Sequence, residues 1–209
     1  MIDPRARAVL DFWFAETRER PQDIPERIEF WFGSGEDPDA VRHLDRDITA
    51  RFGELVEAAG RGDLDAWADD PHTRLALILL IDQFRRNAHR GTAAAFALDR
   101  RALELTLTGL DRMLDQLAPI EQVFFLMPLQ HAEDLAIQQQ SVAAYDRLQA
   151  RVDAPLREAF ASFAEYAVMH RDIVACFGRF PHRNAVLGRA STAAEREYLA
   201  GEAPTFGQS

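Results

Sequence analysis

The sequence predicts an all-α protein, and three observations lead to that prediction. Asp-Pro pairs at 3–4, 37–38 and 70–71 each place a capping carboxylate before a proline suited to a first helical turn. Between residues 41 and 55, apolar side chains recur every three or four positions, as one buried helical face requires. No stretch of the chain alternates apolar and polar residues in the manner of a half-buried strand.

The remaining helix starts are read from capping residues. Thr92 is expected to cap a helix that runs through Phe96 and Leu103, and Asp153 with Pro155 is expected to open another. Thr192 and Glu195 have the spacing of a capping box. The helices predicted in order are 4–15, 38–59, 71–86, 93–108, 118–127, 132–151, 155–177 and 192–200.

Residues 16–36 contain two prolines and two glycines and are predicted to be irregular. Their aromatic cluster, Phe30-Trp31-Phe32, is expected to pack back onto the core. No linker or low-complexity segment divides the chain, so residues 1–209 are predicted to form a single domain.

The Asp-Pro starts at residues 3, 37 and 70 lie 34 and 33 residues apart, close to the period of helical-hairpin repeats. This spacing favours stacked antiparallel helix pairs, although coincidence explains it equally well. Residues 75–84 and 163–177 are apolar around most of the helix circumference, so both are predicted to be central helices of a right-handed stack.

Composition excludes several classes of function. All 24 basic residues are Arg, which excludes Schiff-base lysines and phosphate-binding P-loops. The net charge of −10 argues against binding of a nucleic-acid backbone. Cys176 is the single cysteine, so an intramolecular disulfide or a thiolate zinc cluster is impossible, and we expect a buried, inert thiol.

The N-terminus lacks the pattern of a signal peptide, and the longest fully apolar run, 75–81, is too short to span a membrane. We therefore expect a cytoplasmic protein with no membrane partner. The sequence predicts no oligomeric state.

Two loops that follow apolar helices share a polar pattern. Residues 82–91 and 178–189 each contain an aromatic residue, an Arg-Asn pair, and then Gly with another Arg. Guanidinium groups are planar forks of five donors, and Asn both donates and accepts, so such loops can hold a carboxylate or a phosphate. The alternative is that both loops only cap helix C-termini.

Asp82 continues the apolar face of the helix that precedes it, so its carboxylate is expected to point inward. A buried carboxylate requires a partner, and we predict an Arg. We interpret this pair as structural, with a catalytic acid or base as the alternative.

Two histidines also lie on apolar stripes. His131 is followed by Glu133 and Asp134, and His170 lies on the apolar stripe of 163–177. Both are interpreted as hydrogen-bonded core histidines, because no H-E-x-x-H spacing is present and neighbours one to three apart on a helix rarely reach one ion. The sequence predicts no metal site and, since it contains no G-x-G-x-x-G, no cofactor.

Four motifs resemble a largely bacterial family, the domain of unknown function 924. The motifs are residues 10–14 (LDFWF), 80–87 (LIDQFRRN), 127–134 (MPLQHAED) and 177–189 (FGRFPHRNAVLGR). They differ from the family pattern at Arg85, where proline is usual. The resemblance implies an all-helical fold similar to tetratricopeptide-like helix stacks, and it implies no activity.

Two functional hypotheses follow. The first is binding of a small anionic ligand, with acid–base chemistry by His131, His170 or Glu133 as a possible further step. The second is a helical-repeat module that binds a peptide in a concave groove, with the polar loops as structural clamps. The predicted ligand-binding residues are Asp82, Arg86, Asn87, Arg90, His131, Glu133, Arg179, His182, Arg183, Asn184 and Arg189.

Overall fold

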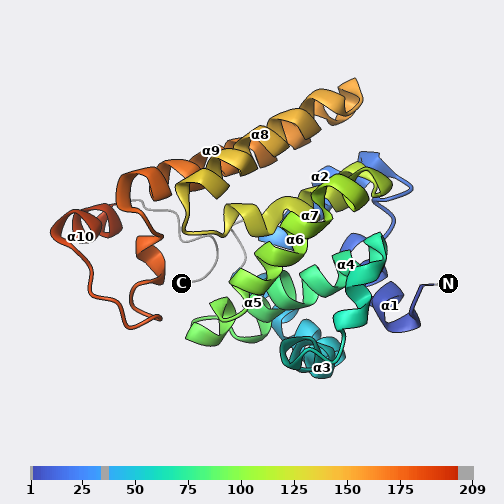
Figure 1. Ribbon diagram of the computed structural model, residues 1–209, viewed down its shortest axis with the longest axis horizontal. Helices are drawn as coiled ribbons and strands as arrows, with labels where there is room; N and C mark the ends of the chain where they lie inside the picture. The colour runs from blue at the N-terminus through green and yellow to red at the C-terminus, as the bar shows by residue number, and fades with distance from the viewer. Residues whose placement is uncertain (1, 34–37, 202–209) are drawn as a thin grey trace.

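The computed structural model describes residues 2–33 and 38–201, which form helices and turns without a β-strand (Figure 1). The all-α prediction is confirmed for this part of the chain. The α-helices are α1 (Pro4–Phe14), α2 (Ile24–Phe32), α3 (Pro38–Arg61), α4 (Pro71–Ile78), α5 (Arg85–Ala88), α6 (Asp99–Met113), α7 (Pro119–Gln130), α8 (Leu135–Arg151), α9 (Arg157–Phe177) and α10 (Ala193–Ala200). The shorter segments are the π-helical η3 (Leu79–Phe84) and the 3₁₀ segments η1 (Pro21–Asp23), η2 (Asp65–Asp69), η4 (Ala93–Phe96), η5 (Leu114–Gln116), η6 (Ala154–Leu156) and η7 (Pro181–Arg183).

Three of the predicted caps are confirmed, whereas the predicted start at Asp153 is wrong: Asp153 makes no side-chain cap, residues 154–156 form η6, and α9 begins at Arg157. Asp3 and Asp70 accept hydrogen bonds from backbone amides of the first turns of α1 and α4. Thr192 and Glu195 form both bonds of the capping box that begins α10. Asp37 lies outside the described residues.

The prediction that residues 16–36 are irregular is wrong for residues 21–32, which form η1 and α2, and its part at 34–36 lies outside the described residues. Pro25 stands in the first turn of α2, where its missing N–H removes no hydrogen bond, so it starts the helix instead of breaking it. Trp31 is buried as expected, whereas Phe32 remains 47% exposed.

The predicted helix 93–108 is also wrong in part. Residues 93–96 form η4, and a separate helix, α6, begins at Asp99. Thr92 makes no cap, because its hydroxyl donates to the carbonyl of His89 in the preceding turn.

Residues 75–84 are buried on every side, as predicted for a central helix, but they are not one regular helix. The chain widens into the π turn of η3, where the N–H of Arg85 donates to the carbonyl of Leu80, five residues earlier. The second predicted central helix is wrong: α9 leaves Tyr166 and Met169 52% and 40% exposed.

The second central helix is α7, of which residues 120–130 are all buried. Figure 1 shows why: α8 and α9 run antiparallel along one side of the molecule, and α7 lies between this hairpin and the helices α4 and α6. The main apolar core extends over α1 to α9, and a small second cluster of Ile173, Val174 and Phe180 lies near the base of α10. The tetratricopeptide-like superhelix and the single-domain organisation stay predictions.

Two further findings concern the excluded classes. Cys176 is exposed, so the expectation of a buried thiol is wrong. It lies near the C-terminal end of α9, after Val174, the last buried residue of that helix. Within residues 2–33 and 38–201, no helix is both long and apolar enough to cross a membrane.

Two helical glycines provide a matched test of the packing. A Cβ added at Gly109 would lie 2.7 Å from the buried ring of Phe125, whereas one at Gly53 would meet nothing closer than 4.0 Å. We expect Gly109→Ala to lower the free energy of unfolding by about 1–3 kcal/mol. Gly53→Ala should raise it by about 0.5–1 kcal/mol, since alanine loses less backbone entropy on folding. Urea denaturation of both variants checks this, and a stabilised Gly109→Ala would contradict the packing.

Candidate functional site

The site is built around Asp82, a fully buried carboxylate in the π turn. Its predicted Arg partner is Arg86, four residues later. The Nη1 of Arg86 lies 3.1 Å from Asp82 Oδ1 and donates to the Asp82 carbonyl oxygen at 2.8 Å. The prediction that an Arg neutralises the inward carboxylate is confirmed.

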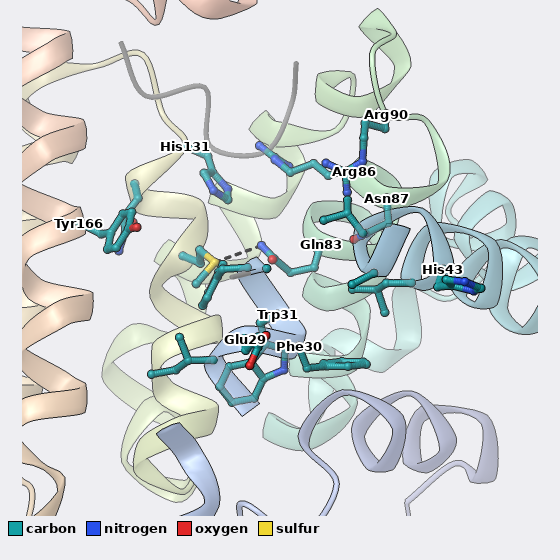
Figure 2. Close-up of a pocket in the computed structure, with 18 of the residues that line it drawn as sticks. Glu29, Phe30, Trp31, His43, Gln83, Arg86, Asn87, Arg90, His131 and Tyr166 are labelled. Carbon is teal, nitrogen blue, oxygen red and sulfur yellow. Dashed lines mark hydrogen bonds between the residues drawn. The ribbon is translucent and has the colours of Figure 1, made fainter. Parts of the chain in front are cut away.

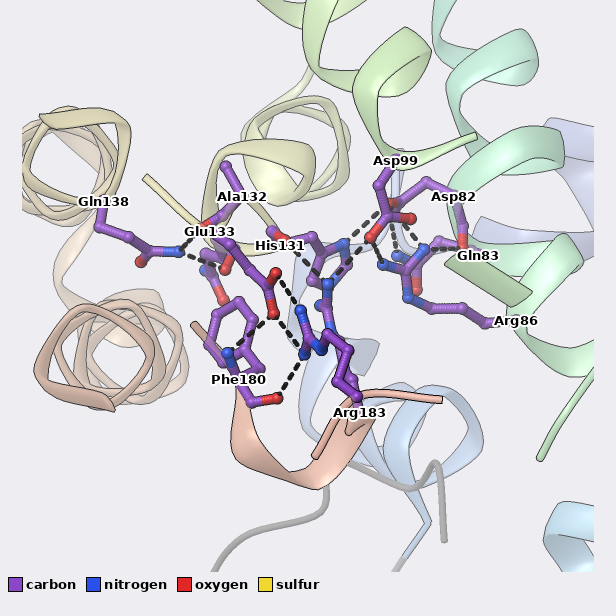
Figure 3. Close-up of polar contacts among 12 residues, drawn as sticks. Asp82, Gln83, Arg86, Asp99, His131, Ala132, Glu133, Gln138, Phe180 and Arg183 are labelled. Carbon is purple, nitrogen blue, oxygen red and sulfur yellow. Dashed lines mark hydrogen bonds and ion pairs between the residues drawn. The ribbon is translucent and has the colours of Figure 1, made fainter. Parts of the chain in front are cut away.

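His131, at the C-terminal end of α7, is the second partner of Asp82 (Figure 3). Its Nδ1 lies 2.7 Å from Asp82 Oδ1, and the side-chain amide of Gln83 donates to Oδ2. Burial alone raises the pKa of Asp82, but the charge of Arg86 and the hydrogen bonds from His131 and Gln83 lower it well below its usual range. Asp82 is therefore ionised at neutral pH.

Asp99, at the start of α6, joins the two Arg-Asn loops. Its Oδ2 lies 2.9 Å from Arg86 Nη2 and 3.1 Å from Arg183 Nη1. Arg86 and Arg183, which are 97 positions apart in the sequence (183 − 86), therefore share one carboxylate oxygen. The loops converge at these two residues.

Arg183 is buried between two aromatic rings. Its guanidinium carbon lies 4.7 Å from the ring centre of Phe96 and 4.5 Å from that of Phe180. Nη1 uses its donors on Asp99 and on the carbonyl oxygen of His131. Within the described part of the chain, Nε and Nη2 make no hydrogen bond, and Nε is buried. Burial lowers the pKa of Arg183 to about 10, so it stays positively charged at neutral pH.

Glu133 anchors the second loop to the end of α7. It accepts two hydrogen bonds from Arg189, at 2.6 and 2.9 Å, and one from the backbone N–H of Phe180 at 2.8 Å. Burial raises the pKa of Glu133, but these donors lower it below its ordinary value. Asp134, beside it, caps α8 through the amides of the first helical turn.

Four other predicted residues form two separate clusters, each around one carboxylate. Arg179 and Asn184 both bind Glu195 of α10. On the opposite loop, Asn87 and Arg90 both bind Asp45 of α3. The structure therefore groups the predicted residues around five carboxylates, Asp82, Asp99, Glu133, Glu195 and Asp45, and not around one point.

A pocket of about 1270 Å³ opens beside this network (Figure 2). Figure 2 shows His131 and Arg86 at one end and Phe30 and Trp31 at the other, with Tyr166 of α9 on one flank and His43 of α3 on the opposite flank. Of the predicted residues, the lining includes Arg86, Asn87, Arg90, His131, His170, His182 and Arg183. Asp82, Glu133, Arg179, Asn184 and Arg189 are not part of that lining.

Three lining histidines are neutral at neutral pH. Burial lowers the pKa of His170 to about 3 and that of His182 to about 4, and it also lowers that of His131. Because an ionised Asp82 can only accept, Nδ1 of neutral His131 carries the proton and Nε2 carries the lone pair. His170 has the same tautomer, since its Nδ1 donates to the Tyr166 carbonyl at 2.7 Å.

Sequence reasoning missed Asp99, Gln83 and Asp45. Within the predicted continuous helix 93–108, nothing distinguishes Asp99 from an acidic surface residue. In the structure α6 begins at Asp99, and its carboxylate binds Arg86 and Arg183. Asp45 lies within α3 and has no distinguishing signal in its own segment. Over residues 2–33 and 38–201, no group of three or more His, Cys, Asp or Glu side chains is arranged to hold a metal ion.

These features define a class: an all-α protein with a buried Asp–His–Arg network beside a large internal pocket. The chain belongs to a family described as "Bacterial protein of unknown function (DUF924)", whose sequence pattern matches residues 9–203. It is also similar to a solved structure, the protein of unknown function ATU0120 from Agrobacterium tumefaciens, with 37% identity and a TM-score of 0.66. That similarity covers 88% of this chain and 98% of the other. No match was found among curated proteins.

The neutral histidines make stability depend on pH. The unfolded chain binds a proton at His170 below about pH 6.5, whereas the folded protein does not until about pH 3, so stability falls as pH falls through this window. We expect His170 alone to contribute a slope of about 1.4 kcal/mol per pH unit between pH 4 and 6. Urea denaturation at several pH values should give a shallower slope for His170→Gln. The exposed His43→Gln serves as control, and an unchanged slope for His170→Gln would contradict the assignment.

Proposed function

We propose that the protein binds a small organic anion in the pocket lined by Arg183 and His131. The observation that carries the proposal is the unused Nη2 of the Arg183 guanidinium. Its Nη1 is used on Asp99 and on the His131 carbonyl, whereas its Nη2 donates to no described residue. Because Arg183 lines the pocket, Nη2 offers a charged donor that an oxygen of a carboxylate or a phosphate would satisfy.

The surrounding network supports this role. Asp99 and the two aromatic rings fix the orientation of Arg183, so little side-chain entropy is lost on binding. The acids Asp82 and Asp99 offset Arg86 and Arg183, and the three histidines are neutral, so the four charged groups sum to zero before a ligand binds. An arriving anion therefore meets directed donors and not a strong positive field.

The remaining predicted residues take a different role in this proposal. Arg86 has both terminal nitrogens engaged with acids, and Arg179, Asn184 and Arg189 are engaged away from the pocket. We assign these residues to bracing the two loops. Direct contact with the anion falls to Arg183 and His131, and then to His170 and His182.

A matched pair of variants tests the proposal. Arg183→Gln and Arg179→Gln each remove one positive charge from the same loop, but only Arg183 lines the pocket. In a thermal-shift screen of carboxylated and phosphorylated metabolites, we expect at least one compound to raise the Tm of the parent and of Arg179→Gln. Arg183→Gln should lose that increase. Equal responses of the two variants, or no response of the parent to any anion, would refute the proposal.

A second candidate function is general-base catalysis by His131, favoured by the hydrogen bond that buried Asp82 makes to Nδ1. This bond fixes the ring and leaves the Nε2 lone pair without a hydrogen bond from any described residue. In ester hydrolysis, Nε2 would take a proton from water while the water oxygen attacks the ester carbon and the alcohol leaves with the returned proton.

We expect slow hydrolysis of p-nitrophenyl esters by the parent protein, with kcat/KM falling at acidic pH as Nε2 becomes protonated. His131→Gln should reduce the rate by about 10²-fold or more, the usual contribution of a general base. Measuring p-nitrophenolate release across pH for both proteins decides this. A rate that is the same in His131→Gln would leave binding as the function.

A further inference from the structure

The pocket has two ends of opposite chemistry. At one end lie Arg183 and the neutral histidines 131, 170 and 182. At the other end, α2 and α3 contribute apolar side chains, and Figure 2 shows Phe30 and Trp31 well separated from His131 and Arg86. The apolar residues that α2 and α3 contribute to the lining include Ile28, Phe30, Trp31, Val41 and Leu44. A small anion held by Arg183 would therefore contact only the polar part of this lining.

Two large side chains are exposed on this pocket without an apparent reason in the fold. Phe32 is 47% and Tyr166 is 52% exposed, and both line the pocket. Both rings therefore offer apolar surface to a ligand in the pocket. The volume, about 1270 Å³, exceeds the roughly 300–1,000 Å³ of most small-molecule sites, so an inorganic anion would fill little of it.

The charges around the pocket are also unequal. Besides Arg183, the lining includes the acids Glu26, Glu29 and Asp47 and the arginines Arg46, Arg86 and Arg90. Figure 2 places Glu29 beside Phe30 and Trp31, away from His131 and Arg86. A second negative charge on the ligand, next to Phe30 and Trp31, would meet the carboxylate of Glu29. The fitting ligand therefore carries its negative charge at one end only and is neutral along the rest of its length.

We propose that the ligand is an amphiphilic anion, a carboxylate or monoester phosphate on a long alkyl or aryl tail. The head binds Nη2 of Arg183, and the tail lies against the apolar lining from α2 and α3, with Phe32 and Tyr166 beside it. This inference rests on the proposed function for the head group, and it adds the chemical class of the rest of the ligand.

The test measures affinity by calorimetry for acetate, octanoate, decanoate and laurate, all below their micelle concentrations, with inorganic phosphate and dodecyl phosphate beside them. Each methylene buried contributes about 0.8 kcal/mol, so we expect affinity to rise up to about fourfold per methylene along the series. Dodecanol should bind at least tenfold more weakly than laurate, because it offers no charge to Arg183.

Three variants separate head from tail. Arg183→Gln should weaken laurate binding at least tenfold. Tyr166→Ala should weaken laurate several-fold while leaving any acetate or phosphate binding unchanged. Met169→Ala is the matched control, since Met169 is 40% exposed on the same helix but is not part of the pocket lining, and it should bind laurate like the parent.

The outcomes distinguish this inference from the function on which it rests. If short anions bind through Arg183 and affinity does not rise with chain length, the amphiphile is wrong and the anion site stands. If a peptide with a free C-terminal carboxylate binds more tightly than laurate, the pocket is a peptide site and the inference is overturned. If no anion of any length binds, both fail.

Discussion

The constraint on which the rest of this structure depends is the buried charge of Asp82. A carboxylate removed from water is stable only if donors surround it, and breaking such a pair by removing one partner costs about 3–5 kcal/mol. The donors come from its own turn, through Gln83 and Arg86, and from the end of α7, through His131. The two most deeply buried segments of the fold are therefore held in register by one ion.

The C-terminal part of the chain is attached in a similar way. Its own apolar cluster contains only Ile173, Val174 and Phe180 as buried members, which is small beside the main core. Its connection to the helical core runs through Glu133, which binds Arg189 and the Phe180 amide, and through Asp99, which binds Arg183. Polar geometry, more than apolar area, fixes the position of Arg183 at the pocket.

Much of the fold could be predicted because local signals decide it. Asp3 and Asp70 begin helices because their carboxylates accept hydrogen bonds from free backbone amides of the first turn. The segment before Asp82 is apolar on every side of the helix, so it must be buried. The errors came from residues whose role depends on distant partners. Pro25 starts a helix because α2 has the core to pack on, and α9 is peripheral because only part of its circumference packs on the core while Tyr166 and Met169 stay exposed.

The site shows the same division. The inward Asp82 and its Arg partner follow from helical spacing, and Arg86 and Arg183 could be anticipated from the repeated loop pattern. Asp99 could not, because only the folded chain brings residue 99 between two arginines from other segments. Nor could the pocket itself, whose apolar end is formed by α2, the helix that the prolines concealed.

The π turn at Leu79–Phe84 places one more residue in the turn than an α-helix holds. Each residue of an α-helix advances the chain by about 100°, so the extra one rotates everything that follows by roughly that angle. The residues after the turn therefore face a different direction from the one they would face if the helix before the turn continued regularly. Arg86 and Asn87 reach the pocket while Leu75 to Ile78 stay sealed in the core. One inserted codon in a regular helix is enough to create such a turn. The number of residues in this turn therefore determines which side chains of the following segment line the pocket.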